Sequence, residues 1–237
     1  MPLYIAIPTY DRLDVFKRKT YTKIIKKYKL EPYVTLFIQS DKDAKEYKEA
    51  FPELKQKRSP KGYLNTLNYI SSYYPLNAKV IKMDDDITQI VHLSGEKLKK
   101  VKDAYGLFNK VFGIMKNVKS NLGGFYPTPN PKFMSGRRPI TTDLRFIVGS
   151  LYCFVNKKIK LKIDGKSDYE FTIENYKRDG KVVRLNHYSL TYDYSDNTEK
   201  SGHDTDRFVK KYEPYISKVI KHKGGSTSFL LKKSIDK

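Results

Sequence analysis

The sequence has one cysteine, no tryptophan and no long apolar run. The single cysteine, Cys153, excludes an intrachain disulfide and disfavours a zinc site built on cysteines. No apolar stretch approaches the roughly 20 residues that cross a bilayer, and the first residues lack the basic region and cleavage site of a secretory signal. We therefore expect a globular protein of the reducing cytoplasm with no membrane partner.

Acidic residues are scarce relative to basic ones. The chain has 47 Lys and Arg against 26 Asp and Glu, a net charge of +21. A field of this size attracts polyanions, and nucleic acid is the commonest such partner. The 20 tyrosines and 12 phenylalanines offer faces on which bases stack, or they fill the core in the absence of tryptophan. A lysine-rich proteome gives the same composition, so both interpretations of the charge stay open.

Apolar strands and amphipathic helices alternate along the first third of the chain. Strands are predicted at residues 3–7, 33–39, 54–57 and 79–83, and helices at residues 14–28, 41–51 and 62–74. This order predicts a Rossmann-type, mainly parallel central sheet flanked by helices, an α/β fold. A smaller mixed part follows, with helices predicted at residues 98–120, 168–178 and 206–221 and strands at residues 145–155 and 182–187.

Polar loops follow three of the predicted strands. Ligands of parallel sheets bind outside the carboxyl ends of the strands, so we expect residues 8–12, 40–43 and 84–86 to converge on one crevice. Asp41 or Asp43 is also expected to cap the helix that begins there. Gly149, inside an apolar run, predicts a bulge or a close approach by a ligand.

Three consecutive carboxylates, Asp84, Asp85 and Asp86, come directly after the strand KVIKM. Asp84 and Asp86 point to the same side of an extended chain, and hard oxygen ligands suit Mg²⁺ or Mn²⁺. A metal held there would neutralise a leaving diphosphate. The alternative is a solvated acidic turn or a helix cap, but the position after a buried strand favours the metal.

Two further segments contain candidate functional side chains. In DYEFTIEN, Asp168 or Glu170 is a candidate general base, although acidic residues at a helix start also complement its dipole. In the late segment SGHD, Gly202 predicts a tight turn near phosphates and His203 a metal ligand. Basic residues that could contact phosphates of a donor or of DNA are Arg12, Lys61 beside Gly62, Arg137 and Arg138.

The order of these motifs resembles that of the TET/JBP-associated glycosyltransferases, a GT-A family of phages and kinetoplastids. The motifs are IPTYDR, MDDD, DYEFT with the later KRDG turn, RLNH and SGH. The resemblance implies a GT-A fold over residues 1–237, with a nucleotide-sugar-binding half at 1–93 and an acceptor-binding half at 94–237. It also implies transfer of a sugar, with glucose the first choice, from a UDP-sugar to a hydroxymethyl group in DNA. The acceptor base would be 5-hydroxymethylcytosine or 5-hydroxymethyluracil, in the host-cell cytoplasm, with inversion.

The resemblance also implies roles for individual residues. Asp84, Asp86 and His203 would hold Mn²⁺ or Mg²⁺, and Asp85 would contact the ribose or the sugar. The base would be Asp168 or Glu170. Thr9, Tyr10, Asp11 and Arg12 would line the uridine site, with Gly202 beside His203 at the diphosphate. Apart from the resemblance, the polar loops and the basic residues add Pro8, Asp41, Lys61 and Gly62 as candidates for the UDP-sugar site.

Three other functions remain compatible with the sequence. A GT-A enzyme with a polysaccharide or another acceptor has the same donor motifs. A basic protein that binds nucleic acid without catalysis needs only the charge, with the three aspartates as a capping cluster. A nucleotidyltransferase or nuclease with two metals would need more clustered acids than this chain shows.

Overall fold

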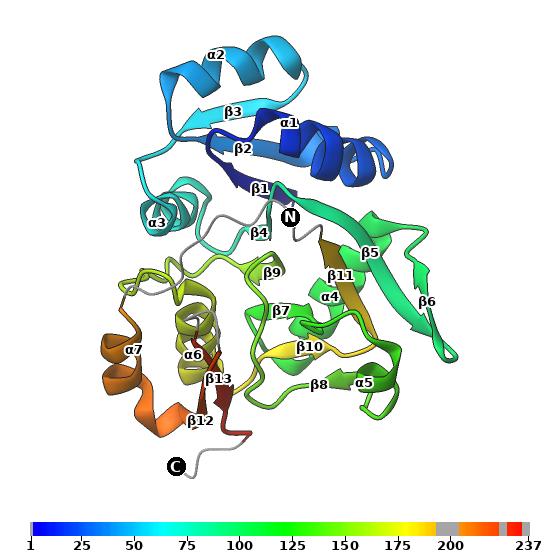
Figure 1. Cartoon of the computed structure of the whole chain (residues 1–237), viewed down its shortest axis with the longest axis vertical. Helices are drawn as coiled ribbons and strands as arrows, with labels where there is room; N and C mark the ends of the chain where they lie inside the picture. Colours follow the sequence, from blue (N-terminus) through cyan, green and yellow to red (C-terminus); the bar gives the residue numbers. More distant parts are fainter. Residues whose placement is uncertain (1, 193–203, 223–226, 234–237) are drawn as a thin grey trace.

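The computed structural model describes residues 2–192, 204–222 and 227–233 (Figure 1). A central eight-stranded sheet has the order β3-β2-β1-β4-β9-β7-β10-β8, which runs from top to bottom in Figure 1. Its strands are β1 (Leu3–Thr9), β2 (Val34–Ile38), β3 (Lys55–Arg58), β4 (Lys79–Met83), β7 (Leu122–Phe125), β8 (Ile140–Thr141), β9 (Leu151–Val155) and β10 (Val183–Leu185).

Strand directions decide which loops meet. Strands β1 to β4 pair in parallel, as predicted. Strand β9 is antiparallel to both β4 and β7, and β10 is parallel to β7. Because β9 runs opposite to both of its neighbours, β7 and β10 have the same direction as β4. The carboxyl ends of β1, β4, β7 and β10 therefore share one edge of the sheet, and β9 begins at that edge.

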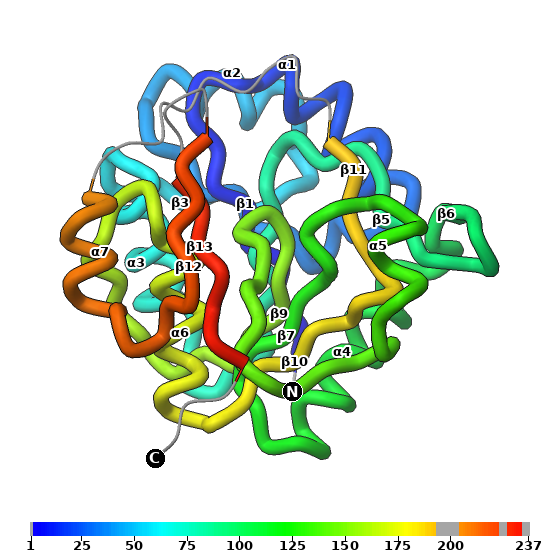
Figure 2. Tube along the Cα trace, turned by 60° about the horizontal axis from the view of Figure 1, so that its bottom comes forward, coloured from blue at the N-terminus to red at the C-terminus, as the bar shows by residue number. Residues whose placement is uncertain are grey.

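Helices cover both faces of this sheet (Figures 1 and 2). The α-helices are α1 (Leu13–Phe16), α2 (Asp41–Ala50), α3 (Tyr63–Tyr73), α4 (Ala104–Val118), α5 (Pro131–Ser135), α6 (Ser167–Asp179) and α7 (Thr205–Tyr212). Along β1, Ile5 and Ile7 are buried in one apolar cluster and Ala6 in another, because successive side chains of a strand point to opposite faces. The continuous apolar composition of β1 and β2 follows from this burial on both sides.

Among the described residues, two small sheets and three helical segments complete the fold. Strands β5 (Ile87–Ser94), β6 (Lys97–Lys100) and β11 (Tyr188–Tyr192) form one sheet, and β12 (Ile216–Lys221) and β13 (Thr227–Leu231) form a hairpin. Figure 2 shows this hairpin beside α6 and α7, where Phe229 packs with Tyr169 and Phe208. The 3₁₀ segments are η2 (Glu31–Tyr33) and η4 (Glu213–Tyr215), and the third segment is the π-helix η1 (Lys17–Lys26).

The π-helix η1 continues α1 without a break and holds a buried threonine. Beyond its last turn, Lys29 has a φ of +55° and the Leu30 N–H donates to the Ile25 carbonyl over 2.9 Å, which closes the helix end in a Schellman motif. The Thr20 hydroxyl donates to the Asp84 carbonyl over 2.9 Å and accepts from the Ile87 N–H over 2.9 Å. This helix therefore fixes the backbone of the turn between β4 and β5.

The structure corrects four sequence predictions. Residues 97–100 are a strand, and the helix predicted from residue 98 begins at Ala104, with the Asp103 side chain as its cap. The strand predicted over 145–155 is confined to β9. The helix predicted over 206–221 ends at Tyr212, since Pro214 follows, and residues 216–221 form β12. Ser40 caps α2, in place of Asp41 or Asp43. Among the described helices, none is long and apolar enough to span a bilayer.

Candidate active site

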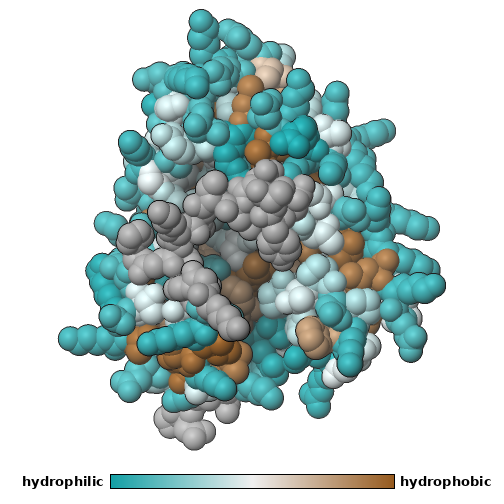
Figure 3. Space-filling model, in the orientation of Figure 1, coloured by the Kyte–Doolittle hydropathy of each residue, from teal (hydrophilic) through white to brown (hydrophobic). Residues whose placement is uncertain are grey.

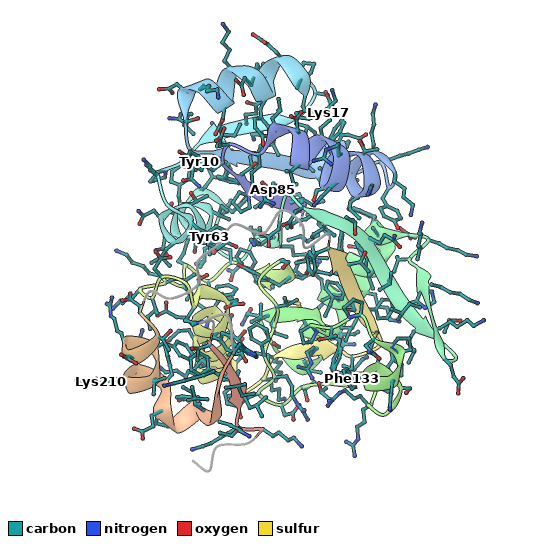
Figure 4. The ribbon with its side chains drawn as sticks, viewed as in Figure 1. Tyr10, Lys17, Tyr63, Asp85, Phe133 and Lys210 are labelled. Carbon is teal, nitrogen blue, oxygen red and sulfur yellow. The ribbon has the colours of Figure 1, made fainter. Side chains whose placement is uncertain are left out.

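The three aspartates lie at the carboxyl end of β4, in the turn that leads into β5. Figure 4 shows Asp85 in the same region of the molecule as Tyr10 and Tyr63. The Asp84 N–H donates to the Ser150 carbonyl over 2.8 Å, and Ser150 directly precedes β9. The triad is thus held by backbone contacts on two sides, from Thr20 and from Ser150. The predicted convergence of loops occurs here, with residues just before β9 as an unpredicted member.

A buried lysine lies beneath the triad. The Lys82 side chain is 1% exposed, and its ammonium group forms an ion pair with Asp84. The same ammonium donates to the Tyr63 hydroxyl over 2.5 Å and to the Gly149 carbonyl over 2.7 Å. An unpaired buried ammonium would be very costly, so these three acceptors are what allow lysine at this position of a core strand. Sequence reasoning missed Lys82; its signal was a lysine between apolar residues of a buried strand.

Asp85 is the most enclosed member of the triad. Its side chain is 5% exposed, accepts from the Thr9 hydroxyl over 2.8 Å and pairs with Arg12 at 3.1 Å. Thr9 is held in turn by the Tyr47 hydroxyl at 2.7 Å. Burial raises the pKa of Asp85 to about 7, against the opposing effects of Arg12 and Thr9. Two residues of the IPTYDR motif therefore anchor this carboxylate.

Asp84 and Asp86 fit the chemistry of a divalent-cation site. Asp86 pairs with Arg12 at 3.2 Å, while Asp84 pairs with Lys82. Burial raises the pKa of Asp84, the nearby Lys82 charge opposes the shift, and the Asp86 charge adds to it. Three carboxyl groups thus face two cationic side chains, Lys82 and Arg12. Within residues 2–192, 204–222 and 227–233, no three His, Cys, Asp or Glu side chains gather in a metal-binding cluster. A cation at Asp84 and Asp86 would therefore need its other ligands from phosphate and water.

Asp168 lies next to the triad, although it is far away in sequence. It belongs to the first turn of α6, and a Cβ built on Gly149 would lie only 3.1 Å from the Asp168 Cβ. Because the Gly149 carbonyl accepts from Lys82, one glycine connects Asp168 to the support of Asp84. Burial raises the pKa of Asp168 to about 6, opposed by the Tyr169 N–H and by the charges of Lys166 and Lys82. A bulge or a close approach by a ligand was predicted at Gly149; the structure places it before β9, where it permits the close approach of the Asp168 side chain.

Glu170 has a different environment. It is fully buried and accepts from the N–H groups of Lys162 and Ile163 at 2.7 and 2.8 Å. It also accepts from the Lys211 ammonium at 2.8 Å and the Tyr212 hydroxyl at 3.0 Å. These four donors tie α6 to α7 and to the loop before α6. Of the two carboxylates proposed as the base, Asp168 is therefore the one that remains partly exposed beside the triad.

The other residues predicted to bind the donor occupy several positions along the same edge. Pro8 and Thr9 complete β1, Tyr10 is 46% exposed, and Asp11 has its N–H bonded to the Asp43 carboxylate at 3.0 Å. Asp41 is exposed and pairs with Arg58 at 3.1 Å.

Two glycines and their basic or metal-ligating neighbours were also predicted at this site. Gly62 has a φ of +97° and begins α3, with its N–H bonded to Gln39 and exposed Lys61 before it. Gly202 and His203 lie outside the described residues.

Known structures of three proteins align with most of the chain. S. aureus TarS (residues 1–349) aligns over 81% of this chain and 60% of that one, with a TM-score of 0.54 and 12% identity. GalNAc-T7 with UDP, GalNAc and Mn²⁺ aligns over 90% and 48%, with a TM-score of 0.54 and 11% identity. Glucosyl-3-phosphoglycerate synthase from Mycobacterium tuberculosis, with Mn²⁺, UDP and glucosyl-3-phosphoglycerate, aligns over 97% and 87%, with a TM-score of 0.53 and 8% identity. The chain has the GT-A fold.

The predicted GT-A-like, mainly parallel α/β architecture is therefore confirmed. At these identities the likeness defines the fold and leaves the substrate open. The chain spans 60% of the TarS structure and 48% of the GalNAc-T7 structure. No protein-family model and no curated protein matches the sequence.

Proposed function

We propose that this GT-A protein is a metal-dependent glycosyltransferase that uses a UDP-sugar as donor. The observation that carries the proposal is the juxtaposition of Asp84, Asp86 and Asp168 at one sheet edge, joined through Lys82 and Gly149. A glycosyl transfer needs a cation site for the diphosphate and a base for the acceptor hydroxyl, and this edge offers both. The GT-A structures described with UDP and Mn²⁺ support the same donor and metal.

The proposed donor site combines the triad with the loop after β1. Asp84 and Asp86 would hold Mn²⁺ or Mg²⁺, which when bound neutralises the charge of the departing diphosphate. Arg12 keeps Asp85 and Asp86 in place and leaves its guanidinium near the phosphates. Exposed Tyr10 offers a ring face for the uracil base. Lys61, Gly62 and Asp41, with Gly202 and His203, complete the proposed site.

The proposed reaction is a single displacement with inversion. The acceptor hydroxyl gives its proton to the Asp168 carboxylate, and its oxygen forms a bond to the anomeric carbon. The bond from that carbon to the diphosphate oxygen breaks at the same time, and its electron pair leaves with UDP. The transition state has oxocarbenium character, as in glycoside hydrolysis. A carboxyl with a pKa of about 6 is well matched to accept a proton near neutral pH.

We propose further that the acceptor is DNA with a hydroxymethylated pyrimidine and that the sugar is glucose, as in the TET/JBP-associated family. The net charge of +21 supports a polyanionic acceptor. Hydrophilic residues cover most of the face seen in Figure 3, which suits a charged partner. A hydroxymethyl group on the pyrimidine C5 projects into the major groove, where a base such as Asp168 could reach it.

The first test is a thermal-shift titration with UDP, UDP-glucose and other nucleotide sugars, with and without Mn²⁺. A rise of the melting temperature that needs both Mn²⁺ and a UDP compound would support the donor site. Release of UDP on addition of hydroxymethylated duplex DNA, and not of unmodified DNA, would then identify the acceptor. Absence of any nucleotide-dependent shift would refute the donor assignment and favour a non-enzymatic DNA-binding protein, whereas UDP binding without transfer to DNA would favour another acceptor.

A further inference from the structure

A polar cavity lies along the same sheet edge, outside the proposed catalytic centre. Its volume is about 470 Å³. It lies on the α5 side of the molecule, which Phe133 marks in Figure 4. The charged residues that line it are Arg137, Arg138, Asp143, Arg145, Arg184 and Lys233. We call it the arginine pocket.

The charge of the arginine pocket is strongly unbalanced. Four arginines and one lysine line it, against a single described carboxylate, Asp143. Arg184 is only 6% exposed. Burial lowers the pKa of Arg184 to about 10, and the charges of Arg145 and Arg137 contribute to the shift. A fold gains no stability from gathering cations in a half-buried cavity, so this arrangement indicates an absent anionic partner.

Three of the four guanidinium groups have contacts that fix their orientation. Arg184 donates to the Asn186 side chain over 2.8 Å, and its guanidinium lies 5.2 Å from the Tyr126 ring centre. Arg137 lies at the same 5.2 Å from that ring and donates to the Tyr126 hydroxyl over 2.9 Å. Arg145 is held by Asp143 at 2.8 Å. Such preorganisation lowers the entropy lost when an anion binds.

The arginine pocket contains guanidinium N–H groups that are available to donate hydrogen bonds to a ligand. Among the described residues, neither the Arg138 guanidinium nor the Arg184 Nη2 atom has a hydrogen-bond partner. Guanidinium groups bind phosphate with paired, charge-assisted hydrogen bonds. The buried Oδ1 atom of Asp143 also has no partner among the described residues, and it would accept from a hydroxyl carried by the same ligand. The chemistry of the arginine pocket therefore fits a phosphate group on a hydroxylated molecule.

The position of the arginine pocket connects it to the proposed centre. Arg184 and Asn186 lie at the carboxyl end of β10, and Asp84 lies at the carboxyl end of β4. The sheet order places β9 and β7 between these strands, so the two ends are three strand spacings apart, about 14 Å. This separation is comparable to the roughly 12 Å width of the major groove of DNA. One acceptor molecule could therefore occupy both places.

We propose that the arginine pocket binds a phosphate group of the acceptor and so positions the acceptor hydroxyl at Asp168. The assignment to the acceptor rests on the proposed function, whereas phosphate binding itself rests only on the arginine pocket. With a DNA acceptor, the bound group is a phosphodiester of the backbone. A terminal phosphomonoester has the same chemistry, and the experiment distinguishes the two.

The test compares two double variants that lose equal charge. Arg138→Gln with Arg145→Gln alters the arginine pocket, and Lys97→Gln with Lys99→Gln removes two exposed charges from β6. Binding is measured with inorganic phosphate and with a short duplex that carries either a hydroxyl or a phosphate at its 5′ ends. Arg184→Lys, which keeps the charge but loses the planar donor pair, provides a second arginine-pocket variant. Thermal unfolding confirms that each variant is folded.

We expect the Arg138/Arg145 double variant to bind the unphosphorylated duplex about tenfold more weakly than the Lys97/Lys99 variant of β6. The slope of log K against log salt concentration should also be less steep, by about the amount that one lost phosphate contact contributes. UDP binding should be unchanged. Loss confined to the 5′-phosphorylated duplex would assign the arginine pocket to a terminal phosphate. Equal binding by the arginine-pocket and β6 variants, or no binding of any probe by the wild type, would overturn the proposal. If UDP fails to bind but the arginine-pocket variants still lose phosphate affinity, the proposed function fails and phosphate binding by the arginine pocket stands.

Discussion

Asp168→Asn should lower the activity and raise the stability of the fold, whereas Glu170→Gln should leave the activity nearly unchanged and lower the stability. Both residues lie in the first turn of α6, and each substitution replaces one oxygen by an NH₂ group. Asp168→Asn removes the proposed base, so we expect kcat to fall by about two to four orders of magnitude. Glu170→Gln leaves the base in place, so the activity per folded molecule should stay within a few-fold of the wild type.

The stability changes follow from the environments of the two carboxylates. Burial raises the pKa of Asp168 to about 6, against about 3.9 in an unfolded chain. A raised folded-state pKa means that the charged form destabilises the fold, a penalty that grows as the pH rises through this window and is complete at pH 7. Asp168→Asn removes that penalty and should stabilise the protein by about 1–3 kcal/mol. Glu170→Gln weakens bonds from four donors and should destabilise it by about 2–4 kcal/mol.

The assay is UDP release in the presence of hydroxymethylated duplex DNA, combined with urea unfolding of each variant. Because the base acts as a carboxylate, wild-type kcat/KM should fall about tenfold per pH unit below pH 6. That acid limb should disappear in the residual activity of the Asp168→Asn variant. The reasoning would be refuted if Asp168→Asn kept wild-type turnover, or if Glu170→Gln abolished turnover while its unfolding free energy stayed unchanged.

Three further substitutions test the parts around Asp168. Asp86→Asn should abolish the Mn²⁺-dependent part of the UDP thermal shift and leave the fold intact; a full shift in this variant would exclude Asp86 as a ligand. Lys82→Met should lower the unfolding free energy by about 3–5 kcal/mol, since it leaves Asp84 without its buried cation; urea unfolding measures this, and a stability equal to the wild type would contradict the ion pair's role. Gly149→Ala should displace Asp168 by a few tenths of an ångström and reduce kcat about tenfold with little change in the donor KM; an unchanged kcat would show that this contact does not position the base.

The parallel half of the fold could be predicted because its signals are local. A helix follows each of the strands β1, β2 and β3, so the alternation of strands and helices was enough to predict a parallel sheet. The errors arose where lysine-rich segments have similar composition in strands and helices. Residues 97–100 pair with β5, a contact that their own composition does not specify. The break at Pro214 and the cap at Asp103 were local signals that outweigh the helix-like spacing around them.

The candidate site likewise has residues that local sequence patterns indicate and residues that only the strand pairing brings together. The three aspartates and Asp168 were identifiable because carboxylates at strand ends and helix starts are conspicuous. Lys82, the contact at Gly149 and the burial of Arg184 depend on β9 entering the sheet antiparallel between β4 and β7. No short-range pattern reports which strands become neighbours. The structure therefore adds the residues that link the predicted carboxylates.

The π-helix η1 makes the chain intolerant of length changes in a segment far from the triad in sequence. Thr20 contacts both the Asp84 carbonyl and the Ile87 N–H because the helix before it is wound more widely than an α-helix. Loss of one residue between α1 and Thr20 would rotate its hydroxyl by roughly 80–100° around the helix axis. An insertion or deletion in this helix would therefore remove the Thr20 contacts that fix the backbone of the turn holding the triad.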